Sequence, residues 1–256
     1  MPIIKKIFDS QLEVTSNHIN DFLTYQSILF SQNERVISLI NKYRFEKTTN
    51  YGCVQKFAYQ NKDYSCLYME MANRIDHIRK FIDIENINTY FEIGGGFGAN
   101  LHFLLTNFKN IKKIIYLDAV PNIYVGTEYL RSLFGKSVID YMQIKKMKEI
   151  KFSNNNDLEI YCIPPWQIEN LNIEIDHFHN AASFVEMPFH VIENYAKFLY
   201  KNKVKSVSLV TYDRYDAKTT FDPKKLNDFF NNELKIYEYP IIITQLNRKN
   251  IYLIKN

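Results

Sequence analysis

The sequence predicts an α/β fold: a doubly wound sheet of mostly parallel strands that ends in an antiparallel strand. From residue 87 onward, short apolar stretches typical of strands alternate with stretches whose apolar residues have helical spacing. This order is typical of a parallel sheet covered by helices on both faces. Near the end the pattern changes, because two apolar stretches within residues 236–255 flank a polar turn. That pattern predicts a hairpin and therefore one reversed strand.

Local signals predict the individual elements. The pattern SQNE at Ser31–Glu34 is a capping box that opens a helix, and a second helix is predicted over residues 65–82. Pro121 suits the first turn of a helix and Gly135 suits its end. Strands are predicted at residues 87–93, 112–118, 158–163, 175–181 and 204–212. Further helices are predicted at residues 98–108, 121–135, 188–200 and 222–234. We therefore expect a helical cap region over residues 1–86 and a main domain over residues 87–256.

Length and composition limit the class of protein. A chain of 256 residues with 46% hydrophobic and 23% charged residues suits one ordinary globular domain with a small extension. No apolar run is long enough to span a bilayer, and the first residues lack the apolar region of a secretory signal. The three cysteines lie far apart and are odd in number, which argues against a disulfide framework and favours a reducing cytoplasm. The net charge of +4 is mild, and the sequence shows no basic groove or recognition domain for nucleic acid.

The glycines of the sequence are concentrated at one junction. Four of the seven lie in residues 94–98, where the stretch EIGGGFG joins a predicted strand to a predicted helix. Glycine permits the tight turn with positive φ that leaves the strand, and it lets a ligand approach the backbone. The N–H groups of the turn and of the helix N-terminus then face that ligand. We therefore expect Gly94, Gly95 and Gly96 to bind a cofactor.

The acids near this turn separate two classes of cofactor only in part. Glu92 stands two residues before the turn, where an acid helps to hold the methionine amino group in S-adenosylmethionine-dependent methyltransferases. The spacing Gly94-x-Gly96-x-x-Ala99 also satisfies the dinucleotide fingerprint. Asp118 ends the second strand, 118 − 92 = 26 residues after Glu92, and an acid there grips ribose hydroxyls in both classes. A doubly wound sheet with an antiparallel last strand is the usual architecture of S-adenosylmethionine-dependent methyltransferases, so Glu92 and the terminal hairpin together favour S-adenosylmethionine over NAD.

The other residues expected in the cofactor site follow the carboxyl ends of neighbouring strands, where ligands bind in such a sheet. They are Ala119, Ile163, Pro164 and Asn180. The stretch IPPW, residues 163–166, resembles the Asn/Asp-Pro-Pro-Tyr loop of amino-methyltransferases that act on DNA, but Ile163 cannot hold an amine by hydrogen bonds. Trp166, the single tryptophan, either stacks near the adenine or packs at the edge of the sheet.

Three stretches resemble the sugar O-methyltransferases of bacterial surface-glycan gene clusters. They are FEIGGGFGANLHFLL, YLDAVPNIYVGTEYLRSLFG and HNAASFVEMPFHVIENYAKFL, all within residues 87–215. The third is the most specific, since it carries the residues of that family at Asn180, Ser183, Phe184, Glu186 and Met187. The resemblance implies a Rossmann-like class I domain over residues 87–256 with S-adenosyl-L-methionine as cofactor. It also implies methyl transfer to a sugar hydroxyl of a small-molecule or glycan-precursor acceptor for capsule or lipopolysaccharide.

A sugar hydroxyl is a poor nucleophile while it is protonated, so a base is expected at the carboxyl ends of the strands. The candidates are His179, Glu186 and Asp213. His179 is the first choice because imidazole titrates near neutral pH, and the alternative is a hydrogen-bonded, half-buried histidine. Glu186 is a second base candidate, or it orients His179, or it caps the helix that follows. His177 and His179 share one face of their strand, but no third ligand is evident, so no metal site is predicted. A carboxylate cluster for magnesium, which some sugar methyltransferases use, stays open as an alternative.

Three alternatives to sugar methylation stay open. One is methylation of a phosphate or phosphoramidate oxygen in the same pathway, for which a cation such as Arg214 matters more than an acid. Another is an NAD-dependent oxidoreductase. The last is a non-catalytic binding module that keeps the cofactor site as structure. The sequence is compatible with a homodimer and does not name the acceptor.

Overall fold

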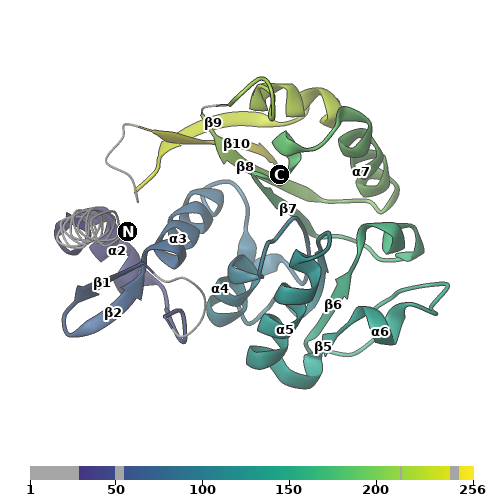
Figure 1. Cartoon of the computed structure of the whole chain (residues 1–256), viewed down its shortest axis with the longest axis horizontal. Coiled ribbons are helices and arrows are strands. Elements are labelled where there is room, and N and C mark those ends of the chain that lie inside the picture. Colours follow the sequence, from purple (N-terminus) through teal and green to yellow (C-terminus); the bar gives the residue numbers. More distant parts are fainter. Residues whose placement is uncertain (1–28, 50–54, 214, 243–247) are drawn as a thin grey trace, which may run out of the picture. The chain divides into compact units, whose positions relative to one another are not determined.

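The computed structural model describes residues 29–49, 55–213, 215–242 and 248–256 (Figure 1). The chain divides into two compact units, Met1–Ala72 and Asn73–Asn256. Helix α3, Cys66–Ile78, runs across this division. Each unit is described by itself below.

The division between the units lies earlier in the chain than the predicted one, which followed residue 86. The C-terminal part of α3 belongs to the second unit because its side chains pack against the last strands. The ring of His77 stacks on Tyr239 with centroids 3.8 Å apart. Farther along the chain, the ring of Phe81 stacks on Tyr237 at 4.0 Å. Residues 73–86 are therefore part of the sheet domain.

The first unit contains a hairpin in addition to helices, which the predicted helical cap did not include. Strands β1, Lys56–Tyr59, and β2, Lys62–Ser65, pair antiparallel. Helix α2, Glu34–Lys42, begins after Asn33, whose side-chain oxygen accepts the N–H groups of Arg35 and Val36 at 2.9 and 3.2 Å. Asn33 therefore takes the capping role predicted for Ser31, which lies inside the preceding helical turn.

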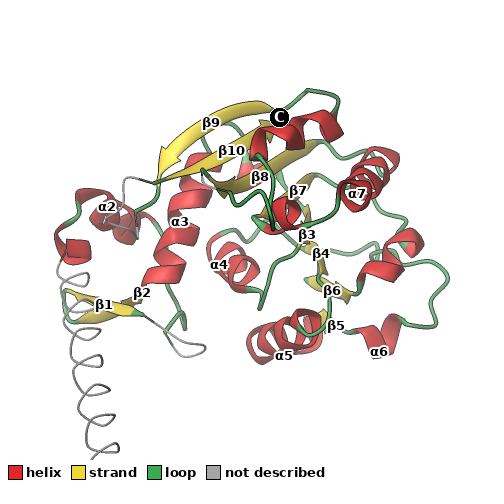
Figure 2. Ribbon diagram, turned by 45° about the horizontal axis from the view of Figure 1, so that its top comes forward, coloured by secondary structure: helices red, strands yellow, loops and turns green. Residues whose placement is uncertain are grey.

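The second unit is built around a sheet whose strand order, within the described residues, is β5-β6-β4-β3-β7-β8-β10-β9 (Figures 1 and 2). The strands are β3 Thr89–Ile93, β4 Lys113–Leu117, β5 Val138–Ile139, β6 Glu159–Ile163, β7 His177–Ala181, β8 Ser206–Tyr212, β9 Lys235–Pro240 and β10 Lys249–Lys255. The strands from β5 to β8 are parallel, and β10 is antiparallel to both β8 and β9. The predicted parallel sheet with an antiparallel last strand is confirmed. The predicted hairpin turn lies mostly outside the described residues.

Helices cover both faces of this sheet, with α4 and α5 on one side and α7 on the other (Figure 2). The helices are α4 Ala99–Asn107, α5 Asn122–Phe134, α6 Tyr141–Ile144 and α7 Phe189–Lys201. Short 3-10 helices are η1 Ile84–Asn86, η2 Gly135–Ser137, η3 Pro165–Asn170, η4 Ser183–Glu186 and η5 Pro223–Phe230. The last of these replaces the helix predicted at residues 222–234. None of the helices in the described part of the chain combines the length and apolar composition of a bilayer-spanning segment.

The central strands determine where a ligand can bind. Every residue of β3, β4 and β6 is buried, as expected for parallel strands between two layers of helices. Strand β3 pairs with β4 on one side and with β7 on the other, although β7 comes much later in the chain. The chain therefore leaves β3 in one direction and returns on its opposite side. Such a switch point opens a crevice at the carboxyl ends of the two strands, where α/β sheets bind ligands.

Candidate cofactor-binding and active site

The glycine turn follows β3 at this switch point. Gly94, Gly96 and Gly98 have φ values of +72°, +60° and +88°, a region that side chains with a Cβ rarely adopt. A Cβ on Gly94 would lie 2.1 Å from Oγ of Ser183, which follows β7. A Cβ on Gly96 would meet no atom within 4 Å. Gly94 is therefore required for close packing between the two loops, whereas Gly96 faces open space that a ligand can enter.

Glu92 is buried beside this turn with one oxygen left without a partner. Its side chain is 1% exposed, and its Oε1 accepts a hydrogen bond from Asn100 Nδ2 at 3.0 Å. Its Oε2 is buried and has no hydrogen-bond donor among the described residues. Burial raises the pKa of Glu92 to about 8; the bond from Asn100 opposes this shift and the charge of Asp118 adds to it. A cationic group of a ligand could therefore donate the hydrogen bond that Oε2 of Glu92 lacks.

Asp118 braces the turn from the neighbouring strand. Its Oδ2 accepts the N–H of Gly96 at 2.8 Å, and its Oδ1 accepts the N–H of Ala119 at 2.7 Å. Burial raises the pKa of the Asp118 carboxyl, and these two backbone bonds oppose that shift. The carboxylate is thus held in one orientation at the end of β4, next to the open position at Gly96.

Tyr116 binds the carbonyl oxygen of Gly96, a role that was not predicted from the sequence. This fully buried side chain of β4 donates its hydroxyl to the Gly96 carbonyl, and the hydroxyl also lies 3.2 Å from the Asn122 carbonyl. A Cβ on Gly126 of α5 would lie 2.2 Å from the same hydroxyl. An isolated glycine inside a predicted helix was the available signal, since such a residue usually has a packing reason.

We expect Gly126→Ala to destabilise the protein by about 2 kcal/mol, because the new methyl group collides with the Tyr116 ring. Without that collision the same change in a helix would stabilise the protein by up to about 1 kcal/mol. Urea denaturation of Gly126→Ala, with Ser132→Ala in the same helix as a control, measures the difference. A gain in stability would contradict the packing role of Gly126.

Asn180 joins the ends of β3 and β7 instead of offering free polar atoms. Its Nδ2 donates to the Ile93 carbonyl at 2.8 Å and to Ser183 Oγ at 2.6 Å, and its Oδ1 accepts the N–H of Phe184 at 3.2 Å. Ala182, between these residues, has a φ of +67°, which is a strained value for alanine. Asn180 therefore supports the turn, and its predicted contact with the cofactor stays a prediction.

The three candidate bases lie in different surroundings. His179 is in the middle of β7, 2% exposed, with Nδ1 2.8 Å from Ser208 Oγ. Burial lowers its pKa to about 3 and the charge of Arg74 lowers it further, so the imidazole is a weak base at neutral pH. This environment favours the hydrogen-bonded histidine that was the alternative to a catalytic role.

The two acidic candidates follow the carboxyl ends of β7 and β8. Glu186 ends η4 with an exposed side chain, and its Oε1 accepts the Tyr212 hydroxyl at 3.3 Å. Asp213 accepts the N–H of Lys249 at 3.1 Å and lies 3.6 Å from Nε of Arg248, so its carboxylate ties β8 to β10. Arg214 lies outside the described residues.

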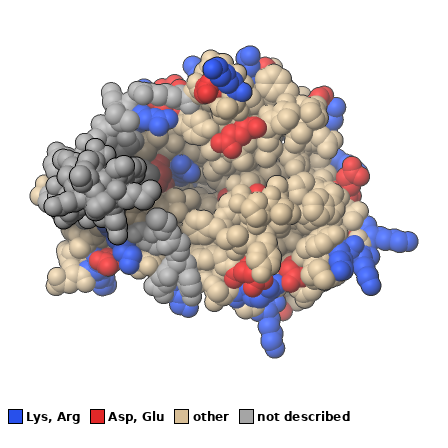
Figure 3. All heavy atoms as spheres, viewed as in Figure 1, with Lys and Arg blue, Asp and Glu red and all other residues tan. Residues whose placement is uncertain are grey.

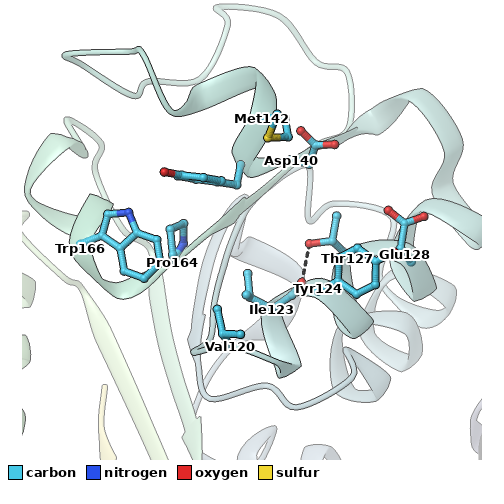
Figure 4. A pocket seen from close by; sticks show the side chains of 10 residues that line it. Val120, Ile123, Tyr124, Thr127, Glu128, Asp140, Met142, Pro164 and Trp166 are labelled. Atoms are coloured by element: carbon cyan, nitrogen blue, oxygen red, sulfur yellow. Dashed lines mark hydrogen bonds between the residues drawn. The ribbon is translucent and has the colours of Figure 1, made fainter.

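A mostly apolar pocket of about 480 Å³ lies beside the expected adenine residues (Figure 4). It is lined by Val120, which precedes α5, by Ile123 and Tyr124 of α5, and from the opposite side by Pro164 and Trp166. Val120 and Trp166 are 69% and 63% exposed, which is unusual for large apolar side chains. Ala119 is exposed next to this pocket, whereas Ile163 is fully buried in β6 and does not line it.

Three further kinds of group can contribute to such a site, namely surface charges, metal ligands and cysteines. On the face shown in Figure 3, Lys and Arg side chains are dispersed instead of forming one stripe. Within the described ranges, no group of three or more His, Cys, Asp and Glu side chains is arranged to hold a metal ion. Of the cysteines, Cys66 and Cys162 are buried and free, and Cys53 lies outside the described residues.

No protein-family model and no curated protein sequence matches the chain. Solved structures similar to it include magnesium protoporphyrin IX methyltransferase from Synechocystis PCC 6803 with bound S-adenosylmethionine, at 6% identity and a TM-score of 0.48 over 75% of this chain and 80% of that one. A methyltransferase domain of bacterial CtHen1 has 10% identity and a TM-score of 0.47 over 72% and 98%. A methyltransferase from Aquifex aeolicus has 13% identity and a TM-score of 0.44 over 73% and 91%. At these values the likenesses say nothing about function, which rests on the chain's own residues.

Proposed function

We propose that the chain is an S-adenosylmethionine-dependent O-methyltransferase. The observation that carries this proposal is the buried Oε2 of Glu92, which lacks a donor among the described residues and would lie 3.2 Å from a Cβ on Gly95. Leaving a buried acceptor unpaired costs about 1–3 kcal/mol. The ammonium group of S-adenosylmethionine is a donor of the right charge for this carboxylate. The pyrophosphate of NAD would instead bring negative charge to the turn beside it.

The remaining residues of the site suit the other parts of that cofactor. We expect Asp118, which two backbone N–H groups hold at the end of β4, to accept the ribose hydroxyls. The apolar pocket beside Val120, Pro164 and Trp166 suits the adenine ring. Gly96 leaves space for the cofactor to approach the backbone. When bound, S-adenosylmethionine supplies an electrophilic methyl group on a sulfonium.

The acceptor that we propose is a sugar hydroxyl of a capsule or lipopolysaccharide precursor, on the basis of the resemblance in residues 179–199. Methyl transfer requires the hydroxyl to be aligned with the methyl group and to lose its proton. Among the three candidates, Glu186 is the exposed carboxylate that is not engaged in holding strands together. We therefore assign the base to Glu186, with Tyr212 orienting its carboxylate.

We expect Glu186→Gln to lower kcat by a factor of about 10²–10⁴, the usual contribution of a general base, without changing cofactor affinity. The measurement is transfer of labelled methyl groups from S-adenosylmethionine to a set of nucleotide sugars. Glu193→Gln, at an exposed glutamate of α7 that pairs with Lys197, is the control and should keep full activity. Equal activity of both variants would remove Glu186 from the mechanism. Absence of transfer by the unmodified protein to any acceptor, together with reduction of NAD, would favour the oxidoreductase.

A further inference from the structure

A continuous chain of buried and partly buried hydrogen bonds runs along the seam between β7 and β8. The two strands pair His177 with Ser206 and His179 with Ser208. Ser208 Oγ lies 2.8 Å from both His179 Nδ1 and His177 Nε2. His177 Nδ1 lies 2.8 Å from Ser206 Oγ, which in turn donates to the Asp176 carbonyl at 2.9 Å. We call these four side chains the histidine–serine ladder.

The ladder has a direction because its last member, the Asp176 carbonyl, can only accept a hydrogen bond. Ser206 donates its one hydroxyl proton there, so its oxygen accepts the Nδ1–H of His177. The Nε2 of a neutral His177 is then an acceptor, and it takes the hydroxyl proton of Ser208. The oxygen of Ser208 therefore accepts a proton from His179, whose Nδ1 must carry it.

Both imidazoles are neutral, which this assignment requires. Each of the two histidines is 2% exposed, and burial lowers the pKa of both below the ordinary value. A neutral ring has one N–H group and one lone pair. Once Nδ1 of His179 is protonated, its lone pair lies on Nε2, to which no described residue donates a hydrogen bond.

The lone pair of His179 belongs to the same face of the sheet as the unpaired carboxylate oxygen. Glu92 and His179 are register partners on the adjacent strands β3 and β7, so their side chains project side by side. The charge of Arg74 also acts on this imidazole, and a nearby cation favours a lone pair over an N–H group. When Glu92 is ionised, its unpaired oxygen and the His179 lone pair are two adjacent hydrogen-bond acceptors. An ammonium group has three N–H donors, and its positive charge favours the ionised form of Glu92.

We propose that the histidine–serine ladder fixes His179 with its Nε2 lone pair beside Glu92, and that the two residues together bind the ammonium group of the cofactor. The ammonium contact rests on the proposed function, whereas the tautomer of His179 does not. In this scheme His179 is a binding residue, and Ser208, His177 and Ser206 are positioning residues that act through it.

The first experiment is nitrogen-15 NMR of the histidine rings in the free protein, with His179 assigned by the loss of its resonances in His179→Gln. We expect a protonated Nδ1 and an unprotonated Nε2 in the unmodified protein. Ser208→Ala should remove the acceptor for Nδ1–H and shift the ring toward the Nε2–H tautomer, while Ser132→Ala on α5 should leave it unchanged. An Nε2–H tautomer in the unmodified protein, or no change in Ser208→Ala, would overturn the ladder.

The second experiment adds S-adenosylhomocysteine, or 5′-methylthioadenosine, which lacks the amino acid part. The first ligand should shift the Nε2 resonance of His179 and the second should not. Ser208→Ala should bind S-adenosylhomocysteine about tenfold more weakly, as expected for one hydrogen bond to a charged group, and bind 5′-methylthioadenosine equally well. Binding of S-adenosylhomocysteine without a shift at Nε2 overturns the ammonium contact alone. Failure of both ligands to bind overturns it together with the proposed function, and the tautomer of the free protein still decides the ladder.

Discussion

Glu92→Gln is expected to weaken binding of S-adenosylhomocysteine by a factor of about 10 to 100. The carboxylate and the ligand ammonium form a charge-assisted hydrogen bond in a buried site, and such bonds contribute about 1.5–3 kcal/mol. Glutamine keeps the size of the side chain and its bond with Asn100, so the fold is retained. Calorimetric titration of the variant and of Glu193→Gln measures the change. Equal affinities would show that Glu92 does not hold the cofactor.

Glu92→Gln weakens ligand binding, but it should stabilise the protein that has no ligand bound. The pKa of Glu92 is about 8 in the folded state, against an ordinary value of 4.5. Between these values the folded state binds one more proton than the unfolded state, so the stability contributed by Glu92 is lost as pH rises from 4.5 to 8. Glu92→Gln lacks this loss and should be more stable at pH 8.5, by an amount on the order of a few kcal/mol. Urea denaturation of both proteins at about pH 5.5, 7 and 8.5 measures this difference. A free energy of unfolding that changes equally with pH in the two proteins would contradict the prediction.

Gly94→Ala should be far more damaging than Gly96→Ala, although both positions have positive φ. A Cβ at Gly94 would lie 2.1 Å from Ser183 Oγ and 2.5 Å from Ser183 Cβ, while a Cβ at Gly96 meets nothing within 4 Å. We expect Gly96→Ala to cost about 1 kcal/mol from backbone strain alone. Gly94→Ala should cost about 3 kcal/mol or more and abolish cofactor binding, because it also separates the loops after β3 and β7. Thermal and urea unfolding of the two variants compares them directly.

A double substitution separates the collision at Gly94 from the backbone strain. Ser183→Gly removes both atoms that the new methyl group would meet, at the cost of the hydrogen bond from Asn180. Ser183→Gly in the Gly94→Ala background should therefore recover part of the lost stability, whereas in the native background it should only destabilise. If the losses of stability in Gly94→Ala and Ser183→Gly simply add in the double variant, the collision with Ser183 is not the cause of the damage in Gly94→Ala.

Most of the sheet could be predicted because the signal for each strand lies in its own residues. The strands around Ile115 and Ile160 contain uninterrupted apolar runs of four residues, and both formed where expected. Strand β5 and the hairpin of β1 and β2 were not predicted, because segments of two to four residues depend on their pairing partners more than on their own sequence. The chain divides after Ala72 and not after residue 86, because His77 stacks on Tyr239, and this contact between residues far apart in the chain has no local signal in the sequence.

The candidate site could be predicted only as far as its local motif extends. The glycine turn, Glu92 and Asp118 follow from spacing, and the structure brings all three together at the end of β3 and β4. Tyr116 and Ser208 could not be found in this way, since their roles arise from partners on other elements. His179 was chosen as the base because imidazole titrates near neutral pH in water, a property that burial in the middle of β7 removes.

The central claim is that the glycine turn binds S-adenosylmethionine, and parallel calorimetric titration of the purified protein with S-adenosylhomocysteine and with NAD tests it most directly. We predict micromolar binding of S-adenosylhomocysteine, reduced in Glu92→Gln and Asp118→Ala proteins that remain folded, and no binding of NAD. Binding of NAD alone, or binding of S-adenosylhomocysteine that neither substitution alters, would contradict the assignment of this site.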